Sequence, residues 1–382
     1  MPTSDVRQRH HRPYGGHESD PEVEFGKDYE HLLYSSAFRR LGGVTQVVGV
    51  NETALFHNRM THSLKVAQVG QRLTKKLLDK MDNDRQLYGV VEEYGGGLDS
   101  GVVYAACIAH DLGRPPFGYV AEMALRKLTT GRPDTSDRDG SQVFPAVGEG
   151  EELSDSYSNH AQTFRIVNKL AFRESYGDGK SAALNLTRAT LAALLVYPWS
   201  FADRTRPVGW GNTDQLPSWG YYDSEKDLFE FVSGLIRPRT VTLPNGEESI
   251  EYRTVEAQVV NWADDITYAI HDVEDFFRAH LIPLDILNRS DERFAEFFDY
   301  AWKRVERVFV SENASQAQRQ AARERVEQFL NEARTKLPVR PYTGSRYDRE
   351  DLHTFASTII HSATEHTELT KDGLVRPAER DL

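Results

Sequence analysis

The sequence predicts a mostly α-helical protein, and three observations lead to this fold class. Apolar residues recur at helical spacing through most of the chain. Only one pair of short segments has the alternation and the turn residues typical of strands, so the pattern does not indicate a parallel sheet. The 382 residues, of which 39% are hydrophobic and 27% charged, are enough to bury a large core in an ordinary globular protein.

The first 25 residues lack apolar periodicity, so they are predicted to form a flexible arm. Helical spacing begins near Tyr29, stops at Gly42 and returns in a longer amphipathic segment. A third, apolar helix is expected to end at His110, because Gly113 and the prolines after it cannot continue a helix. The helices expected in this part of the chain span residues 29–41, 61–80, 102–109 and 120–128.

Residues 130–155 are rich in Gly, Pro, Asp and Ser and are predicted to form a surface loop. A β-hairpin is expected with strands at 239–243 and 249–252, joined by a turn that contains Asn245-Gly246. Further helices are expected at 159–174, 181–196, 223–235, 255–282, 291–306, 316–336 and 348–366. The chain is therefore divided into a flexible arm (1–25), a core domain (26–290) and a C-terminal helical part packed on that core (291–382).

The net charge of −12 argues against a general attraction to nucleic acid or acidic lipid, although it permits a local basic pocket for a phosphorylated ligand. No segment approaches the ~18 apolar residues of a membrane-spanning helix, and the polar N-terminus does not read as a secretory signal. Cys107 is the single cysteine, so no disulfide is possible within one chain. These features together predict a cytoplasmic protein without a membrane partner.

Four residues on three predicted helices have the chemistry of metal ligands. His110 and Asp111 are adjacent, His62 lies in the first turn of one helix, and Asp264 lies on another. A single histidine is more often packed or solvated than a ligand, and Asp264 alone would suit an exposed helix charge. As a set, two imidazoles and two carboxylates suit Mn²⁺, Fe²⁺, Co²⁺, Ni²⁺ or Zn²⁺, and Mg²⁺ less readily.

The order His…His-Asp…Asp resembles that of the HD-domain phosphohydrolases, which implies a helical bundle with the metal in its core. The flanking segments are similar, more specifically, to the deoxyguanosine triphosphatase family, the deoxynucleoside triphosphate triphosphohydrolases. The resemblance covers roughly residues 28–280. The segments that carry it are Ala37–Leu41, Thr45–Val47, Arg59–Leu64, His110–Gly118 with Glu122, Asn159–Arg165 and Ala263–Asp272.

This resemblance implies hydrolysis of a deoxynucleoside triphosphate to a deoxynucleoside and inorganic triphosphate. The implied metal ligands are His62, His110, Asp111 and Asp264, with Mn²⁺ or Mg²⁺ expected first and Fe²⁺, Co²⁺, Ni²⁺ or Zn²⁺ as alternatives. Family members often form homo-oligomers, frequently hexamers, so the resemblance also implies a homo-oligomer. The acidic composition of this chain makes nucleic acid only a minor expectation as a partner.

The resemblance also implies residues that bind the substrate. Arg59 matches an arginine that contacts the phosphates, a role suited to its planar fork of donors. Gln46 matches a glutamine at the sugar, and Tyr268 a tyrosine that packs on the deoxyribose. Asp272 matches a carboxylate that accepts from the 3′-hydroxyl, and it shares one helix face with Asp264 and Tyr268 because the three are spaced i, i+4, i+8.

The chain departs from the family at two positions. Arg114 and Tyr119 stand where the family commonly has histidines beside the phosphates, whereas the glutamate implicated in proton transfer is present as Glu122. An arginine binds phosphate oxygens but does not shuttle protons near neutral pH. His160 is a candidate to supply the missing imidazole, with a structural or phosphate-binding role as its alternative. Three activities stay open: a triphosphohydrolase with rearranged proton transfer, a hydrolase of another nucleotide, and a non-catalytic nucleotide sensor or subunit.

Overall fold

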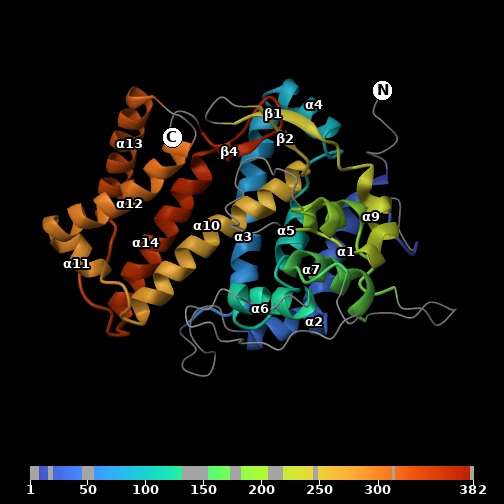
Figure 1. Ribbon diagram of the computed structural model, residues 1–382, viewed down its shortest axis with the longest axis horizontal. Helices are drawn as coiled ribbons and strands as arrows, with labels where there is room; N and C mark the ends of the chain where they lie inside the picture. Colours follow the sequence, from blue (N-terminus) through green and yellow to red (C-terminus); the bar gives the residue numbers. More distant parts are fainter. Residues whose placement is uncertain are drawn as a thin grey trace.

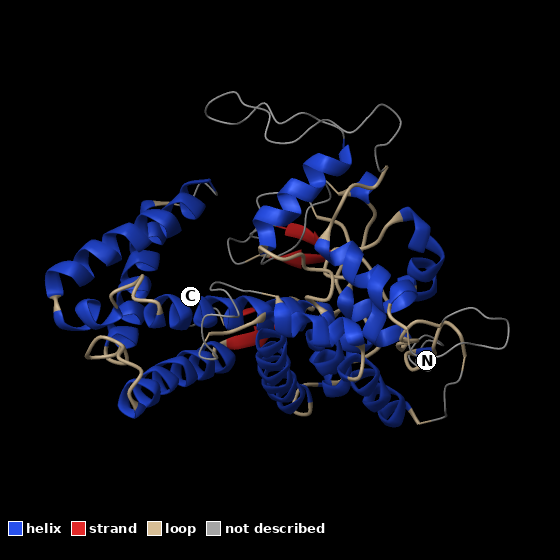
Figure 2. Ribbon diagram, turned by 90° about the horizontal axis from the view of Figure 1, so that it is seen from below, coloured by secondary structure: helices blue, strands red, loops and turns tan. Residues whose placement is uncertain are grey.

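The computed structural model confirms the mostly α-helical fold class (Figures 1 and 2). The structure describes residues 8–15, 20–44, 56–130, 154–172, 182–204, 218–243, 248–311 and 315–378, and the side chains at 130 and 307–311 are not described. Gln46, most of the predicted 130–155 loop and the turn of the predicted hairpin fall outside these residues. Within the described residues, none of the helices combines the length and the apolar content needed to cross a bilayer.

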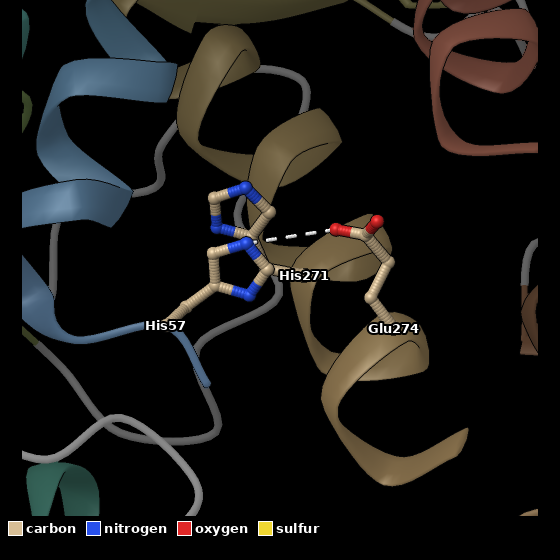
Figure 3. A group of neighbouring side chains, drawn as sticks. All are labelled: His57, His271 and Glu274. Atoms are coloured by element: carbon tan, nitrogen blue, oxygen red, sulfur yellow. Dashed lines mark ion pairs between the residues drawn. The ribbon is translucent and has the colours of Figure 1, made fainter. Parts of the chain in front are cut away.

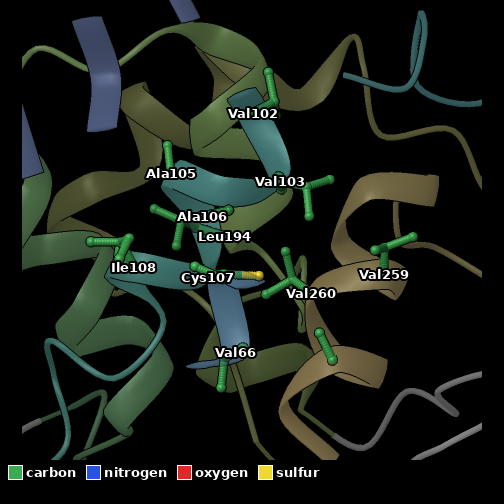
Figure 4. Close-up of a cluster of buried hydrophobic side chains, with 14 of the residues drawn as sticks. Val66, Val102, Val103, Ala105, Ala106, Cys107, Ile108, Leu194, Val259 and Val260 are labelled. Carbon is green, nitrogen blue, oxygen red and sulfur yellow. The ribbon is translucent and has the colours of Figure 1, made fainter. Parts of the chain in front are cut away.

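Three helices form the centre of the fold: α3 (Arg59–Met81), α5 (Ser100–Ala109) and α10 (Val255–Arg278). Helix α5 is apolar on all sides, and every residue from Ala105 to Ala109 is fully buried (Figure 4). Gly70 lets α3 approach α5 closely, because a Cβ there would lie 2.8 Å from the Sγ of Cys107. The central helices therefore pack closely side by side, and this packing sets the positions of the residues at their ends.

Shorter helices surround this centre, and α1 and α8 pack directly on α5. They are α1 (Pro21–Leu33), α2 (Ser36–Arg40), α4 (Arg85–Glu93), α6 (Gly118–Thr130), α7 (Asn159–Arg165), α8 (Arg188–Leu194) and α9 (Lys226–Ser233). Helix α4 was not expected from the sequence, and the expected helix at 181–196 shortens to α8. Its first residues cannot be helical, because Ala183 and Asn185 have φ of 49° and 47° and Thr187 caps α8.

The C-terminal helices extend from one end of α10. Helices α11 (Leu284–Arg289), α12 (Asp291–Ser311) and α13 (Gln316–Arg334) lie to one side of the molecule in Figure 1, and α14 (Arg346–Glu365) returns along α10 and contacts α3. Phe277 of α10 packs with Leu352 and Phe355 of α14 in a small core of its own.

Two small antiparallel hairpins complete the fold. The expected hairpin is present as β1 (Arg239–Thr242) paired with β2 (Glu248–Glu251). A second hairpin, β3 (Thr367–Leu369) with β4 (Val375–Pro377), was not expected, since strands of three residues are too short to show a periodic pattern. Gln258 of α10 ties β4 to the core by accepting from the Val375 N–H at 2.9 Å.

The prediction of a flexible arm over residues 1–25 is wrong for the part that the structure describes. Arg12 is buried, with its Nε 2.6 Å from Glu24 Oε2 and its Nη1 2.8 Å from Asp28 Oδ1. Arg9 likewise donates to Glu256 at 2.6 Å. A search for apolar periodicity misses this contact, because buried ion pairs, and not apolar side chains, hold the segment against the core.

Candidate metal centre

The first turn of α3 places Arg59 and His62. Asn58 caps the helix by accepting from the Thr61 N–H at 2.9 Å, and the Thr61 hydroxyl lies 3.0 Å from the Asn58 N–H, which together make a capping box. Helix α3 therefore begins at Arg59, and the imidazole of His62 points into the protein with no exposed surface.

His110 ends α5 and is oriented by the helix itself. Its Nδ1 lies 2.7 Å from the carbonyl oxygen of Cys107, so Nδ1 carries the proton and donates it. The other ring nitrogen, Nε2, is buried and makes no hydrogen bond within the described structure. Once this nitrogen gives up its proton, its lone pair is free, which is the arrangement in which a histidine binds a metal ion.

Helix α10 brings Asp264 to both histidines. Asp264 Oδ1 lies 2.9 Å from His62 Nε2 and 3.4 Å from His110 Nε2. Asp111 joins from the other side, with its Oδ1 3.7 Å from His110 Nε2. The structure thus brings together all four residues that the sequence suggests as metal ligands, from α3, from the end of α5 and from α10.

The charges of this group favour a cation. Burial alone would lower the pKa of His110, but Asp111 and Asp264 outweigh it and raise the pKa to about 9. Burial alone would raise the pKa of Asp264, but His110 and His62 hold it well below its usual value. Two carboxylates thus stabilise the protonated, positively charged form of His110. A divalent ion could replace that proton and balance the charge of the carboxylates. The residues present fit a metal with mixed N/O ligation.

Two arginines hold Asp111. Arg59 Nη1 lies 2.9 Å from Asp111 Oδ2, and Arg114 Nε lies 3.1 Å from Asp111 Oδ1. Although burial opposes it, the charges of Arg59, His110 and Arg114 keep the pKa of Asp111 far below the usual range. The Nε of Arg59 is buried and has no hydrogen-bond partner among the described residues. The guanidinium group of Arg59 therefore has a buried donor that remains available beside the suggested metal ligands.

Gly118 leaves room for the Arg59 side chain. Its φ of 55° is in the left-handed region, and a Cβ there would lie 3.3 Å from Arg59 Nη2. A larger residue at this position would be strained and would crowd the guanidinium group.

The exposed face of α10 extends the site beyond Asp264. Tyr268 is half exposed, and its ring centroid lies 6.2 Å from that of His62 in an edge-to-face arrangement. Burial and the neighbouring carboxylate of Asp272 raise the pKa of the Tyr268 hydroxyl, so this hydroxyl stays protonated and donates to Asp272. The polar stripe expected from the i, i+4, i+8 spacing therefore borders the metal ligands.

The residues suggested for proton transfer lie in different environments. Glu122 is buried, and its Oε1 accepts from Arg126 Nη2 at 2.8 Å and from the Asn159 N–H at 3.2 Å. The ring of His160 packs edge-to-face on Tyr197 at 4.7 Å, and Tyr119 is exposed. Arg114 connects Glu122 to the metal ligands electrostatically, because Asp111, Glu122 and Asp264 together raise its pKa against the effect of burial.

Sequence reasoning did not single out a second group of histidine and carboxylate side chains, formed by His57, His271 and Glu274 (Figure 3). His271 and Glu274 are one turn apart on α10, and His57 lies just before α3. The His-x-x-Glu spacing was a signal available in the sequence. Only the packing of α3 against α10 reveals that His57 completes the group.

Comparison with known proteins gives two results. The sequence profile of the HD domain matches residues 59–195, a segment that contains His62, His110 and Asp111 but ends before Asp264. The chain is also 32% identical over 307 residues to deoxyguanosinetriphosphate triphosphohydrolase-like protein 2 of Mesorhizobium japonicum, a match that covers 79% of this chain and 56% of that protein.

Two further relatives carry similar names. The chain is 33% identical over 279 residues to the deoxyguanosinetriphosphate triphosphohydrolase-like protein of Streptomyces coelicolor, with 72% of this chain and 51% of that protein covered. It is 32% identical over 263 residues to the protein of the same name in Synechocystis sp., with 68% of this chain and 56% of that protein covered. The chain thus spans about half the length of the curated relatives that it matches.

Proposed function

Because residues 59–195 match the HD-domain profile and the chain is similar to deoxyguanosinetriphosphate triphosphohydrolase-like proteins, we propose that it is a metal-dependent hydrolase of deoxynucleoside triphosphates. The products are a deoxynucleoside and inorganic triphosphate. The proposal depends most on one observation: two histidines and two carboxylates converge where two arginines already neutralise Asp111.

The reaction adds the oxygen of water to the α-phosphorus and breaks the bond from that phosphorus to O5′. Bound by His62, His110, Asp111 and Asp264, a divalent ion would polarise the α-phosphate and make the attacking water more acidic. Arg59 and Arg114 bind the non-bridging phosphate oxygens and balance the charge that gathers there as the bond breaks. Arg114 stands where the family commonly has a histidine. It can take over phosphate binding from that histidine, but not proton transfer.

The sugar is bound by the exposed face of α10. The ring of Tyr268 packs against the deoxyribose and leaves no space for a 2′-hydroxyl, and Asp272 accepts from the 3′-hydroxyl. A buried 2′-hydroxyl without a partner costs about 1–3 kcal/mol, so the packing of Tyr268, and not the pairing with the 3′-hydroxyl, selects the deoxyribose. Gln46, which lies outside the described residues, remains a predicted sugar contact.

The leaving O5′ must gain a proton, and three residues are the candidate donors: Tyr119, Glu122 and His160. The carboxylate of Glu122 is already bound by Arg126 and by the Asn159 N–H, which favours a role in orienting its neighbours. This same observation supports the second candidate function, a nucleotide sensor or regulatory subunit that binds without turnover. A homo-oligomer and a cytoplasmic location belong to the proposal as well, as the resemblance and the composition imply.

The proposal is tested by incubating the purified chain with each deoxynucleoside triphosphate, and separately with each ribonucleoside triphosphate, in the presence of Mn²⁺ or Mg²⁺. Ion-exchange chromatography separates tripolyphosphate from pyrophosphate and orthophosphate. We expect tripolyphosphate from the deoxynucleotides alone. Pyrophosphate or orthophosphate would indicate a hydrolase of another kind, and tight binding without turnover would indicate the sensor.

A further inference from the structure

We propose that His271 is a positioning residue of the metal centre, since its ring accepts a hydrogen bond from Nδ1–H of His62 and so holds His62 with Nε2 toward the metal. The inference rests on the metal-binding part of the proposed function. His271 is not one of the suggested ligands, and it acts through His62.

The argument begins with the two ring nitrogens of His62. Nε2 lies 2.9 Å from Asp264 Oδ1, on the side of the metal ligands, and Nδ1 lies 3.4 Å from Nδ1 of His271. A neutral imidazole that offers Nε2 to a metal must carry its proton on Nδ1. Because His62 is fully buried, that proton needs an acceptor inside the protein, and His271 Nδ1 is the neighbour in that direction.

His271 is suited to accept because it is buried, with an exposed fraction of 3%, and its Nδ1 lies 3.4 Å from Nδ1 of His62. A neutral imidazole has one proton and one lone pair. With the proton on Nε2, the lone pair of Nδ1 faces His62.

His57 fixes the plane of the His271 ring. Figure 3 shows the two imidazoles lying one over the other. Their centroids are 3.7 Å apart and their planes are within 8° of parallel. Asp275 holds His57 twice, because its Oδ1 lies 2.9 Å from His57 Nδ1 and its Oδ2 accepts from the His57 N–H at 3.0 Å. A continuous chain of contacts thus leads from Asp275 through His57 and His271 to the ligand His62.

The same group also has the composition of a second metal site, because ligand atoms of His57, His271 and Glu274 lie within 4.8 Å of one another. Its geometry argues against that assignment. The lone pair of a ring nitrogen lies in the ring plane, so the lone pairs of two stacked, nearly parallel rings do not converge on one ion. Arg278 also lies 3.5 Å from Glu274 and 2.9 Å from Asp275. These carboxylates are therefore already paired with a positive charge, and a metal ion is not needed to balance them.

Calorimetric titration of the metal-free full chain with Mn²⁺ tests the inference without any measurement of activity. We expect one bound ion per chain for the wild type and about 10- to 100-fold weaker binding for His271→Leu, the usual loss when the orienting partner of a ligand is removed. His271→Asn should retain most of the affinity, because its amide oxygen can accept near the position of Nδ1. His353→Ala, at an exposed position on α14, is the matched control and should bind as the wild type does.

Nitrogen NMR of the Zn²⁺-loaded wild-type chain provides a second readout that needs no variant. We expect the proton of His62 on Nδ1 and that of His271 on Nε2. The opposite tautomer of His271, wild-type Mn²⁺ affinity in a folded His271→Leu, or a second bound ion lost in His57→Ala would each overturn the inference. A wild-type chain that binds no metal would remove the proposed function and this inference together, whereas metal binding without nucleotide turnover would remove only the proposed reaction.

Discussion

Two groups of histidines and carboxylates lie next to each other between α3 and α10, and they differ in the directions of their lone pairs. In the candidate metal group of His62, His110, Asp111 and Asp264, the ring nitrogens and carboxylate oxygens converge, and Nε2 of His110 has no hydrogen-bond partner among the described residues. In the supporting group of His57, His271 and Glu274, the rings are stacked and engaged with their neighbours. Suitable residue types within a few ångströms are therefore not sufficient for a metal site.

Their electrostatics differ in the same sense. Carboxylates around His110 raise its pKa to about 9, whereas burial and surrounding cations keep the pKa of His271 well below its usual value. The first environment favours positive charge on an imidazole, and the second disfavours it. Both groups use α10 for a ligand or a support, so a change in one group is expected to affect the other through His62.

Removing Asp111 should have the largest effect, since it takes away a ligand and the partner of two arginines. Asp111→Ala should weaken Mn²⁺ binding more than about 100-fold, and it should destabilise the fold by about 3–5 kcal/mol because Arg59 is left buried without its partner. Calorimetry and urea unfolding measure the two effects. Asp351→Ala on α14 is the control, and Mn²⁺ affinity unchanged by Asp111→Ala would show that the metal assignment is wrong.

The pH dependence of metal binding is the next largest effect. His110 holds a proton below about pH 9 in the metal-free protein, so an ion must displace that proton in order to bind. The apparent Mn²⁺ affinity should therefore rise with pH by about tenfold per unit up to that value, which calorimetry in buffers from pH 6.5 to 8.5 would detect. Affinity that levels off near pH 7 would contradict the influence of the two carboxylates on His110.

Arg114 should matter for substrate more than for metal. Arg114→Gln removes a charged donor to a phosphate, and such a bond contributes about 1.5–3 kcal/mol, so kcat/KM should fall about 10- to 100-fold. Mn²⁺ affinity should change little, because Arg59 still binds Asp111. Comparing Arg114→Lys with Arg114→Gln separates the effect of the positive charge from the effect of the planar arrangement of guanidinium donors. A loss of metal binding as large as that of Asp111→Ala would place Arg114 in the support of the ligands instead.

The smallest effect is expected at His57 in the supporting group. His57→Phe keeps a ring stacked on His271 but loses the side-chain hydrogen bond to Asp275. Asp275 is still paired with Arg278. Stability should fall by about 0.5–1.5 kcal/mol, the net value of one hydrogen bond. Mn²⁺ affinity should fall by less than about tenfold, the lower limit for loss of an orienting partner. A larger loss of Mn²⁺ affinity, measured by the same calorimetric titration, would mean that His57 itself binds the ion.

Much of the fold could be predicted because its signals are local. The long helices α3 and α10 are amphipathic with clear caps, and α5 is apolar until glycine and proline stop it. The anchored segment around Arg12 and the three-residue strands β3 and β4 were missed because long-range ion pairs and very short strands leave no periodic pattern. The left-handed residues Ala183 and Asn185 delay the start of a predicted helix to Arg188, and no periodic pattern marks such residues.

The sequence by itself determined which residues are available for the chemistry and which helix carries each one. His62, the His110-Asp111 pair and Asp264 follow from motif order and helical spacing alone. Only the tertiary structure decided how these side chains are oriented: Nε2 of His110 lies 3.4 Å from Asp264 Oδ1, and His271 lies on the Nδ1 side of His62. Local spacing fixes the face of a helix, but the direction of a lone pair depends on hydrogen bonds between segments about 200 residues apart.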